Sequence, residues 1–302
     1  MASASTVHGD CLVTFTQALP AEPLRPYISG YQFVELTGPP GAEITDYAYP
    51  SWANLRLLFD GEDWSVAIGA RIYEPAERLV LFGPLSHAAR ITCKTPCRRV
   101  AVGVTPLGWA RLFRRDASAY ADRLTPLGDL IGADADLTAE ALAARPEPEP
   151  AFEVLDALLA PRLAASTPPS IEVQRMHDLI MSDEMIEVSD FAERLGMSTR
   201  HAARLCAEVF GFAPKLLFRR RRFLRTLNAL REPGDTPWRS RLDASYHDQP
   251  QFSRDFRAFM GMSPSEFFAR PRPMMEASHC ARAAVLGVGI QGLQPPIRGS
   301  AG

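Results

Sequence analysis

Arginine, glutamine and serine side chains collect on the outer faces of two predicted amphipathic helices in the last third of the chain. An arginine on such a face can donate two parallel hydrogen bonds to guanine or to a phosphate, and a glutamine can pair with adenine. A solvated helix face in an all-helical protein is the alternative interpretation of the same pattern. The residues on these faces that we predict to contact DNA are Thr199, Arg200, His201, Arg204, Gln249, Gln251, Ser253, Arg254 and Arg257. Arg219 and Arg222, on the helix that connects the two, belong to the same predicted set.

Both helices belong to a repeated unit. Each follows a short helix and a turn, and each is followed by a Gly-x-x-Pro sequence that ends at Pro214 in the first copy and at Pro264 in the second. Ser198 is a good N-cap for the first of these helices, and apolar residues recur at helical spacing from Ala202 to Val209. A helix of about 24 Å joins the copies, which suits two units about one DNA turn, or about 34 Å, apart. A repeated helix-turn-helix unit predicts a DNA-binding protein.

Charge is divided unevenly along the 302-residue chain, whose formal net charge is −2. Residues 185–273 hold 16 Lys and Arg against 10 Asp and Glu, whereas the rest of the chain holds 17 against 25. A basic C-terminal module on an acidic body favours nucleic-acid binding by the module, although a solvated charged surface would give the same balance.

The N-terminal half of the chain is predicted to form short strands and then helices. Seven segments between Ile28 and Val104, each of about five to nine residues, are separated by Gly, Pro and Asp turns. This spacing is typical of an antiparallel barrel or sandwich. We therefore predict an α+β protein with an N-terminal antiparallel β-barrel, flanking helices and a C-terminal all-α domain. The expected divisions are a flexible N-terminus at 1–23, a sensing or dimerisation domain with a helical extension at 24–165, a DNA-binding domain at 170–270 and a disordered tail at 271–302.

The C-terminal residues 171–270 resemble the DNA-binding domain of AraC-type transcriptional regulators in the order and spacing of both copies. The resemblance implies seven helices in which a long helix joins two helix-turn-helix units. The matching positions are Leu195, Ser198, Arg200, Arg204, Phe210, Gly211, Pro214, Arg219, Arg222, Phe223, Tyr246, Asp248, Gln249, Phe252, Ser253, Arg254, Phe256, Arg257, Gly261, Ser263 and Pro264. We therefore expect a cytoplasmic regulator that binds double-stranded DNA and, if it is an activator, RNA polymerase.

The second copy departs from the family pattern before its recognition helix. Ser245 stands where the family usually has glycine, and Ser240 and Arg241 stand where apolar residues are expected. We therefore expect a less stable second unit, which contacts DNA weakly or only through phosphates.

Residues 24–132 resemble the sensing domain of a subset of these regulators. The resemblance implies a cupin-like barrel that binds a small effector, mediates homodimerisation, or does both. An aromatic residue in such a barrel is more often core than pocket, and an arginine is more often a surface partner. The candidates for effector contact are Tyr49, Trp52, Arg56, Trp64 and Arg71. A cupin metal site needs two or three His and a carboxylate, and His87 is the one His between residues 24 and 140, so we expect no metal.

No pattern in the chain predicts chemistry on a substrate. We find no nucleophile-base pair and expect neither enzyme activity nor a cofactor. The glycines from Gly287 to Gly292 fit a dinucleotide-binding pattern, but too few residues follow them to complete a βαβ unit. Five cysteines without repeated pairing favour a reducing compartment, and no apolar run is long enough to span a membrane.

The alternative function keeps the fold and changes the role of the repeat. In it, the barrel is a small-molecule binder or enzyme, and the helix-turn-helix domain serves assembly. A steep loss of nucleic-acid affinity with added salt would favour the DNA-binding protein over this alternative.

Overall fold

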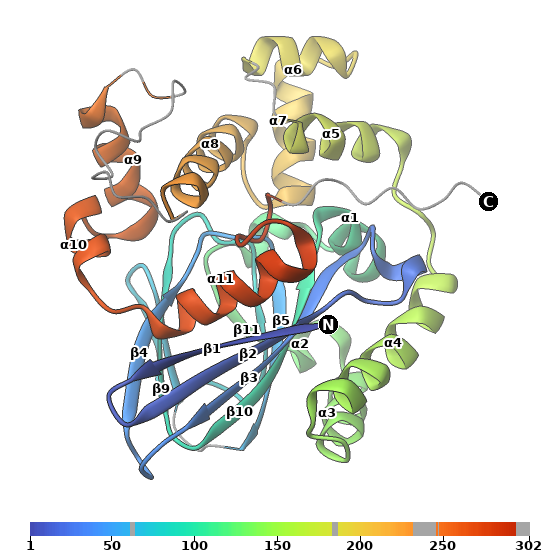
Figure 1. The fold of residues 1–302 in the computed structure, drawn as a ribbon. Helices are drawn as coiled ribbons and strands as arrows, with labels where there is room; N and C mark the ends of the chain where they lie inside the picture. The colour runs from blue at the N-terminus through green and yellow to red at the C-terminus, as the bar shows by residue number, and fades with distance from the viewer. Residues whose placement is uncertain (61–63, 183–186, 232–245, 247, 294–302) are drawn as a thin grey trace.

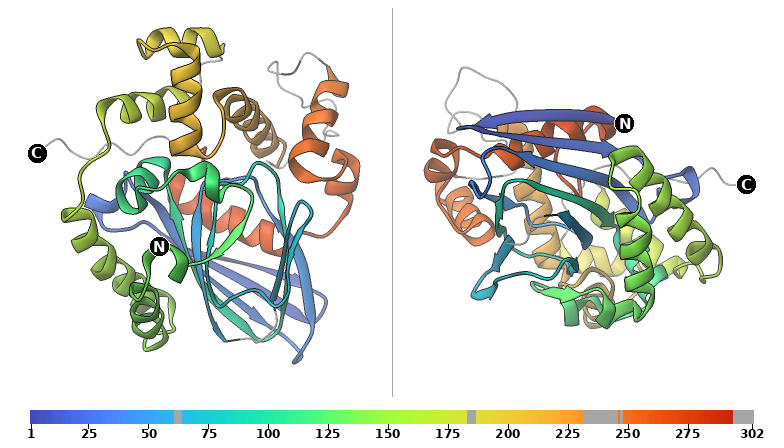
Figure 2. Two further views of the ribbon diagram at one scale, coloured as in Figure 1. Left: turned by 180° about the vertical axis from the view of Figure 1, so that it is seen from behind. Right: turned by 90° about the horizontal axis from the view of Figure 1, so that it is seen from below.

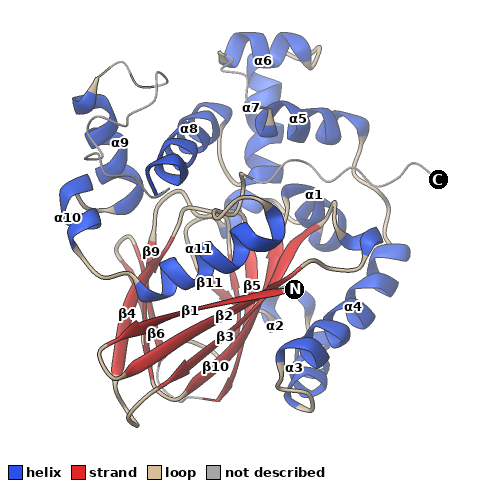
Figure 3. Ribbon diagram, in the orientation of Figure 1, coloured by secondary structure: helices blue, strands red, loops and turns tan. Residues whose placement is uncertain are grey.

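The computed structural model describes residues 1–60, 64–182, 187–231, 246 and 248–293. In this part of the chain two antiparallel sheets face each other, and helices cover one end of them and part of one face (Figures 1 and 3). This arrangement confirms the predicted α+β class, with a β-rich N-terminal region and a helical C-terminal region.

The two sheets share one apolar core. The larger sheet has the strand order β1 (Ala2–His8), β2 (Cys11–Ala18), β3 (Ile28–Thr37), β10 (Cys97–Val104), β5 (Asn54–Asp60), β8 (Leu79–Phe82) and β11 (Leu124–Pro126). The smaller sheet has the order β4 (Glu43–Ala48), β9 (Ala89–Lys94), β6 (Trp64–Ile68) and β7 (Arg71–Tyr73). Buried side chains of both sheets, such as Val34 and Ile91, meet between them because alternate residues of each strand point inward. The view from below shows the two layers (Figure 2, right).

Short helical segments extend the sheets. They are η1 (Glu22–Leu24), α1 (Pro106–Gly108), η2 (Trp109–Phe113), η3 (Ala117–Tyr120), α2 (Gly128–Ile131), α3 (Asp134–Ala143) and α4 (Pro148–Ala164). The longest, α4, packs its buried Phe152 against the outer side of the larger sheet, where Phe152 stacks on Tyr31 at a ring-centroid distance of 5.6 Å. The Tyr31 hydroxyl also donates a hydrogen bond of 2.8 Å to Asp156. These contacts attach the predicted helical extension to the sheet.

The C-terminal helices form two groups on either side of one long helix. The first group is α5 (Ile171–Met181), α6 (Val188–Arg194) and α7 (Thr199–Phe210), and the second is α9 (Gln249–Met260) and α10 (Pro264–Ala269). Between them lies α8 (Pro214–Arg231), as the front and rear views both show (Figure 1; Figure 2, left). The residues Ser240, Arg241 and Ser245, on which the expected weakness of the second unit depends, lie outside the described residues.

Both ends of the described chain differ from the sequence-based expectation. Residues 1–23, expected to be flexible, contain β1 and β2, and the side chains of Ser3 and Ser5 bond Thr16 and Thr14 across the pair. In the expected tail, α11 (Pro273–Leu286) crosses β1, β2 and β4 (Figure 1). Its small and sulfur-containing side chains, such as Met274 and Ala281, enter the core between the sheets. A tertiary surface therefore orders segments whose composition alone predicts disorder. The boundary near residues 165–170 stays a prediction.

Candidate functional site

Helix α7 presents its polar face to solvent. The Ser198 side chain accepts a hydrogen bond from the His201 backbone N–H, which confirms the predicted N-cap and starts the helix. Ala202 and Cys206 are fully buried on the opposite face. The predicted contact residues Thr199, Arg200, His201 and Arg204 are all exposed. Arg204 forms an ion pair of 3.3 Å with Glu208 one turn further on, which leaves it free to turn toward another partner at small cost.

Helix α9, on the other side of α8, likewise has a side-chain N-cap and one buried apolar face. The Asp248 side chain caps it by accepting the Gln251 backbone N–H at 2.6 Å, and Pro250 occupies its first turn, where a missing N–H costs nothing. Three phenylalanines and Met260 are buried beneath it. Of the predicted contact residues on this helix, Gln249, Arg254 and Arg257 are exposed, whereas Gln251 and Ser253 are half-buried.

Both predicted contact residues on α8 form ion pairs with α9. Arg219 Nε lies 2.6 Å from Oδ1 of Asp255, and Arg222 Nη2 lies 3.2 Å from its Oδ2. The Tyr246 hydroxyl donates to the same Oδ2 at 2.9 Å, and the Asp255 side chain is only 5% exposed. Sequence reasoning missed Asp255, because an aspartate in a helix between phenylalanines carries no sign of its partners. The cluster orients α9 on α8 and leaves Arg219, with 42% of its side chain exposed, the more accessible of the two arginines.

The arginine run on α8 also anchors the helix to the sheets. Arg220 is 3% exposed, and its Nη1 donates to the carbonyls of Ser51 at 3.3 Å and Leu85 at 2.8 Å. Its guanidinium lies 4.2 Å from the ring centroid of Trp52. Burial lowers the Arg220 pKa to about 10, so the group stays charged at neutral pH. The buried cation therefore joins the DNA-binding region to the β-rich region.

Further contacts hold the second group of helices on the sheets. The Tyr49 hydroxyl accepts a hydrogen bond of 2.6 Å from Arg231 at the end of α8, and the Tyr47 hydroxyl accepts one of 3.0 Å from Arg270 beyond α10. The Ala88 N–H donates to the Phe259 carbonyl. Apolar clusters cross the same boundary on both sides of α8. The two recognition helices, α7 and α9, are thus placed relative to each other by α8 and by the sheet edge beneath it.

A small cavity of about 100 Å³ lies between the larger sheet and α11. Two of the predicted effector-contact residues, Tyr49 and Arg56, line it. The other three lie elsewhere: Trp52 stacks under Arg220, Trp64 donates its indole N–H to the Ala76 carbonyl in the core, and the exposed Arg71 bonds the Asp122 carbonyl. The sequence did not mark α11, although its residues close the cavity; Ser278, Arg282 and Gln291 come from it or from the segment that follows.

The two cysteines near the cavity are both buried thiols. Arg99 Nη1 lies 2.8 Å from Cys93 Sγ, and the Cys97 thiol also forms a hydrogen bond with the Cys93 sulfur. The bond from Cys97 and the positive charge of Arg99 lower the Cys93 pKa to about 6. The described residues contain no group of three or more His, Cys, Asp or Glu that could hold a metal ion. Nor is any helix in that part of the chain long and apolar enough to cross a membrane.

Asp46 fastens the beginning of α11 to β4. Its Oδ2 accepts the N–H groups of Met274 at 2.8 Å and Met275 at 2.9 Å, and its side chain is buried. Burial raises the Asp46 pKa from 3.8 to about 6, against the opposing effect of those bonds and of the Arg272 charge.

Asp46 is expected to make stability depend on pH. Because its folded pKa lies above 3.8, its contribution is complete below that pH and is lost as pH rises toward 6. The free energy of unfolding of the parent, relative to that of Asp46→Asn, is expected to fall by about 3 kcal/mol over this window. Denaturant unfolding across the window measures it. Burial lowers the His279 pKa to about 4, an effect of opposite sign that cancels in the comparison. Parallel pH profiles for the two proteins would contradict the assignment.

Comparison with known proteins adds a family to this geometry. Residues 191–270 match the family model described as a helix-turn-helix domain. A search of curated proteins finds no match. An apo variant of ToxT from Vibrio cholerae strain SCE256 is 11% identical over 87% of this chain and 98% of its own, with a TM-score of 0.44. The AraC-like transcriptional activator CuxR is 15% identical over 74% and 86%, with a TM-score of 0.33.

A cupin superfamily protein from Desulfitobacterium hafniense is 6% identical over 33% of this chain and 81% of its own, with a TM-score of 0.24. With all three TM-scores below 0.5, these likenesses support no statement about the ligand or the partners of this chain. The matched domain covers α7, α8, α9 and α10, and so includes α7 and α9, which carry exposed arginines. The match gives this part of the chain an AraC-type helix-turn-helix domain, which is the DNA-binding domain of a transcriptional regulator.

Proposed function

We propose that the protein regulates transcription by placing α7 and α9 in successive major grooves of one face of DNA, in response to a small molecule bound by its β-rich region. The observation that carries this proposal is the pair of capped helices on either side of α8, each with an exposed polar face and a buried apolar face. A helix whose first turns are exposed in this way fits a major groove, because the groove admits one helix and its base edges face outward.

The side chains of the predicted set have different roles in this proposal. Arg200, His201 and Arg204 on α7, and Gln249, Arg254 and Arg257 on α9, contact bases and phosphates directly. Near the beginning of each helix, Thr199, Gln251 and Ser253 contribute hydrogen bonds to the DNA backbone. Arg222, with 19% of its side chain exposed, positions α9 through Asp255, and Arg219 adds a phosphate contact from its exposed side. A basic groove along α8, which Lys215 and Arg225 also line, extends this surface.

The β-rich region senses the effector in the cavity that Tyr49 and Arg56 line. Tyr49 supports this role, since its hydroxyl also bonds Arg231 of α8 and thus connects the cavity wall to the DNA-binding region. We further propose that the protein acts in the cytoplasm, where its DNA lies, as a homodimer through the β-rich region, and that it contacts RNA polymerase when it activates.

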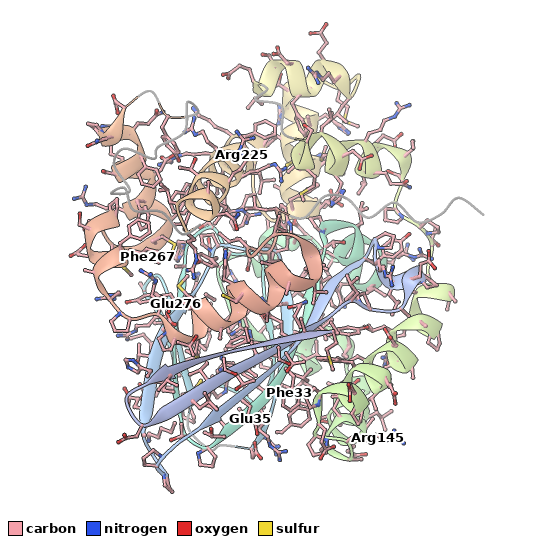
Figure 4. All side chains as sticks on the ribbon, in the orientation of Figure 1. Phe33, Glu35, Arg145, Arg225, Phe267 and Glu276 are labelled. Carbon is pink, nitrogen blue, oxygen red and sulfur yellow. The ribbon has the colours of Figure 1, made fainter. Side chains whose placement is uncertain are left out.

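The substitutions Arg204→Ala and Arg254→Ala are each expected to weaken binding to the preferred DNA by about 5- to 150-fold, since each arginine contacts a base or phosphate at about 1–3 kcal/mol. The DNA is the duplex that the parent protein enriches most from a randomised pool, and affinity is measured by titration at several salt concentrations. Arg145→Ala is the matched control, because Arg145 is exposed at the end of the molecule away from α7 and α9 (Figure 4).

The control is expected to bind with the affinity and the salt dependence of the parent. If Arg204→Ala and Arg254→Ala also match the parent, α7 and α9 do not contact DNA. If the parent protein enriches no duplex even at low salt, the proposed function itself is wrong.

A further inference from the structure

The cavity beneath α11 has an unusual floor. On the larger sheet, β3, β10 and β5 lie side by side, and their pairing places Gln32, Ala101 and Arg56 in one row, and Gly30, Gly103 and Asn54 in the next. The small side chain of Ala101 leaves space between the sheet and α11, and the two glycines make room for the side chains of Gln17 and Gln291. The helix supplies the opposite wall, where Ser278 accepts a hydrogen bond of 2.9 Å from Gln32.

Three guanidinium groups line this cavity, and none of the described residues that line it is an aspartate or glutamate. Arg56 comes from β5, Arg99 from β10 and Arg282 from α11. Arg56 donates to the neutral Asn54 side chain at 2.8 Å, and its guanidinium lies 4.0 Å from the Phe82 ring centroid. Arg282 is 7% exposed, and its buried Nη1 has no hydrogen-bond partner. Burying a cation without a hydrogen-bond acceptor costs free energy, and a negatively charged ligand at this position would reduce that cost.

Arg99 has a partial counter-charge of its own. Its Nη1 lies 2.8 Å from Cys93 Sγ, and its Nη2 lies 3.4 Å from Met274 Sδ. A Cys93 thiolate would pair with Arg99 and also attract Arg56, but its single negative charge would face three guanidinium groups. Arg56 and Arg282 therefore face the cavity as cations in either state of Cys93, one from the sheet and one from α11. Their pKa values, lowered by burial to about 9 and about 10, still leave both charged at neutral pH.

We propose that the cavity binds a small carboxylate, whose oxygens accept hydrogen bonds from Arg282 on α11 and Arg56 on β5. The inference rests on the proposed function, in which this cavity senses the effector. A ligand of about four to six non-hydrogen atoms fits, since a cavity of about 150 Å³ accommodates benzene. The apolar side chains of Val34, Ile91 and Met275 line the same space and favour a carboxylate with a short alkyl end over an inorganic anion.

The ligand would also join two parts of the molecule. Arg282 belongs to the helix that follows the DNA-binding domain directly, and Arg272 connects α11 to α10 by bonding Glu276 and the Phe267 carbonyl. Figure 4 shows Glu276 and Phe267 close to this junction. A carboxylate that bonds both Arg56 and Arg282 stabilises the docked position of α11 on the sheet. The second recognition helix α9, one element further from α11, is thereby held against the cavity wall at Tyr47 and Tyr49.

The test uses the full chain without DNA. Binding of sodium butyrate, acetate, pyruvate and inorganic phosphate is measured by calorimetry, together with the thermal unfolding midpoint, and butyramide serves as the neutral match to butyrate. At least one carboxylate is expected to bind and raise the midpoint, whereas butyramide does neither. Arg282→Met and Arg56→Met are each expected to weaken binding at least tenfold. Arg98→Met is the control: Arg98 precedes Arg99 on β10 and pairs with Asp60 outside the cavity. This variant is expected to bind the carboxylate like the parent.

Without ligand, Arg282→Met is expected to unfold at a midpoint equal to or above that of the parent, because it removes an uncompensated buried charge. A lower midpoint would mean that the guanidinium already has a partner, and would overturn the proposal. Equal shifts with butyrate and butyramide would overturn it too, as would unchanged affinity in both arginine variants. Binding of phosphate alone would reject the carboxylate, and binding of none of the four anions would reject the site. Because no DNA is present, these results do not depend on the outcome of the DNA titration, which tests the proposed function separately.

Discussion

Replacement of Asp255 by asparagine is expected to lower the free energy of unfolding by about 3 kcal/mol. The buried carboxylate accepts from Arg219, Arg222 and Tyr246. Asparagine keeps the volume but removes the negative charge, which leaves the Arg222 guanidinium in its half-buried position without a counter-charge. Because Arg219 is partly exposed and can turn to water, the effect lies at the lower end of the range for broken buried pairs. Denaturant unfolding measures it.

The control for this change is Asp134→Asn, which removes the carboxylate of an exposed pair with Arg162 at 2.9 Å. Its expected effect is below about 1 kcal/mol. Hydrogen exchange adds a local measurement: amides of α9 are expected to exchange faster in Asp255→Asn while those of α3 and α4 do not change. Equal losses of stability for the two variants would show that the Asp255 cluster is no stronger than a surface pair.

Arg220→Met is expected to loosen the DNA-binding region from the β-rich region. Methionine fills much of the volume but leaves the Leu85 carbonyl without a donor, at about 1–3 kcal/mol, and removes one of the two donors of the Ser51 carbonyl, which keeps the Leu85 N–H, at about 1 kcal/mol. The free energy of unfolding is therefore expected to fall by about 2–4 kcal/mol. The contact with the Trp52 ring is lost as well. The expected local result is faster hydrogen exchange at α8 and at the loop that holds Ser51.

Lys215→Met provides the matched control on the same helix, since Lys215 is exposed at the beginning of α8. Its expected effect is within about 0.5 kcal/mol. A stability of Arg220→Met equal to that of Lys215→Met would mean that the buried cation is energetically neutral. Arg220→Met should also reduce the effect of any cavity ligand on DNA affinity, because the contact it removes joins α8 to Ser51, which lines the cavity.

These predictions concern one structural property: the recognition helices are not carried on an independent module. Phe210 of α7 packs edge-on against Trp52 of the β-rich region, and Gly211, at a φ of 84°, lies close against Pro84. On the other side of α8, Tyr47 and Tyr49 are packed against the cluster that contains Phe223 and Phe256. Tyr47 and Tyr49 of the cavity wall therefore contact the second group of helices directly, and Trp52, which follows the cavity-lining Ser51, contacts the first group.

Local patterns in the sequence were sufficient for the secondary structure and family of the DNA-binding region. The Ser198 cap, the apolar spacing from Ala202 to Val209 and the repeated Gly-x-x-Pro depend on neighbours within a few residues, and the structure reproduces them. The same holds for the antiparallel strands between Ile28 and Val104, whose alternation reflects one buried and one outward face.

The sequence by itself determined the strands between Ile28 and Val104, the repeat of the C-terminal helices, and the arginine-bearing faces of α7 and α9 that the structure exposes. Only the tertiary structure decided what each arginine of α8 contacts. Successive residues of a helix point about a quarter-turn apart, so Arg219 and Arg222 meet Asp255 while Arg220 is directed at the sheets. The tertiary structure also ordered β1 and α11, which lack strong local signals and gain their stability by pairing and burial. The cavity between Arg56 and Arg282 exists for the same reason, since residues 226 positions apart meet only when α11 docks on the sheet.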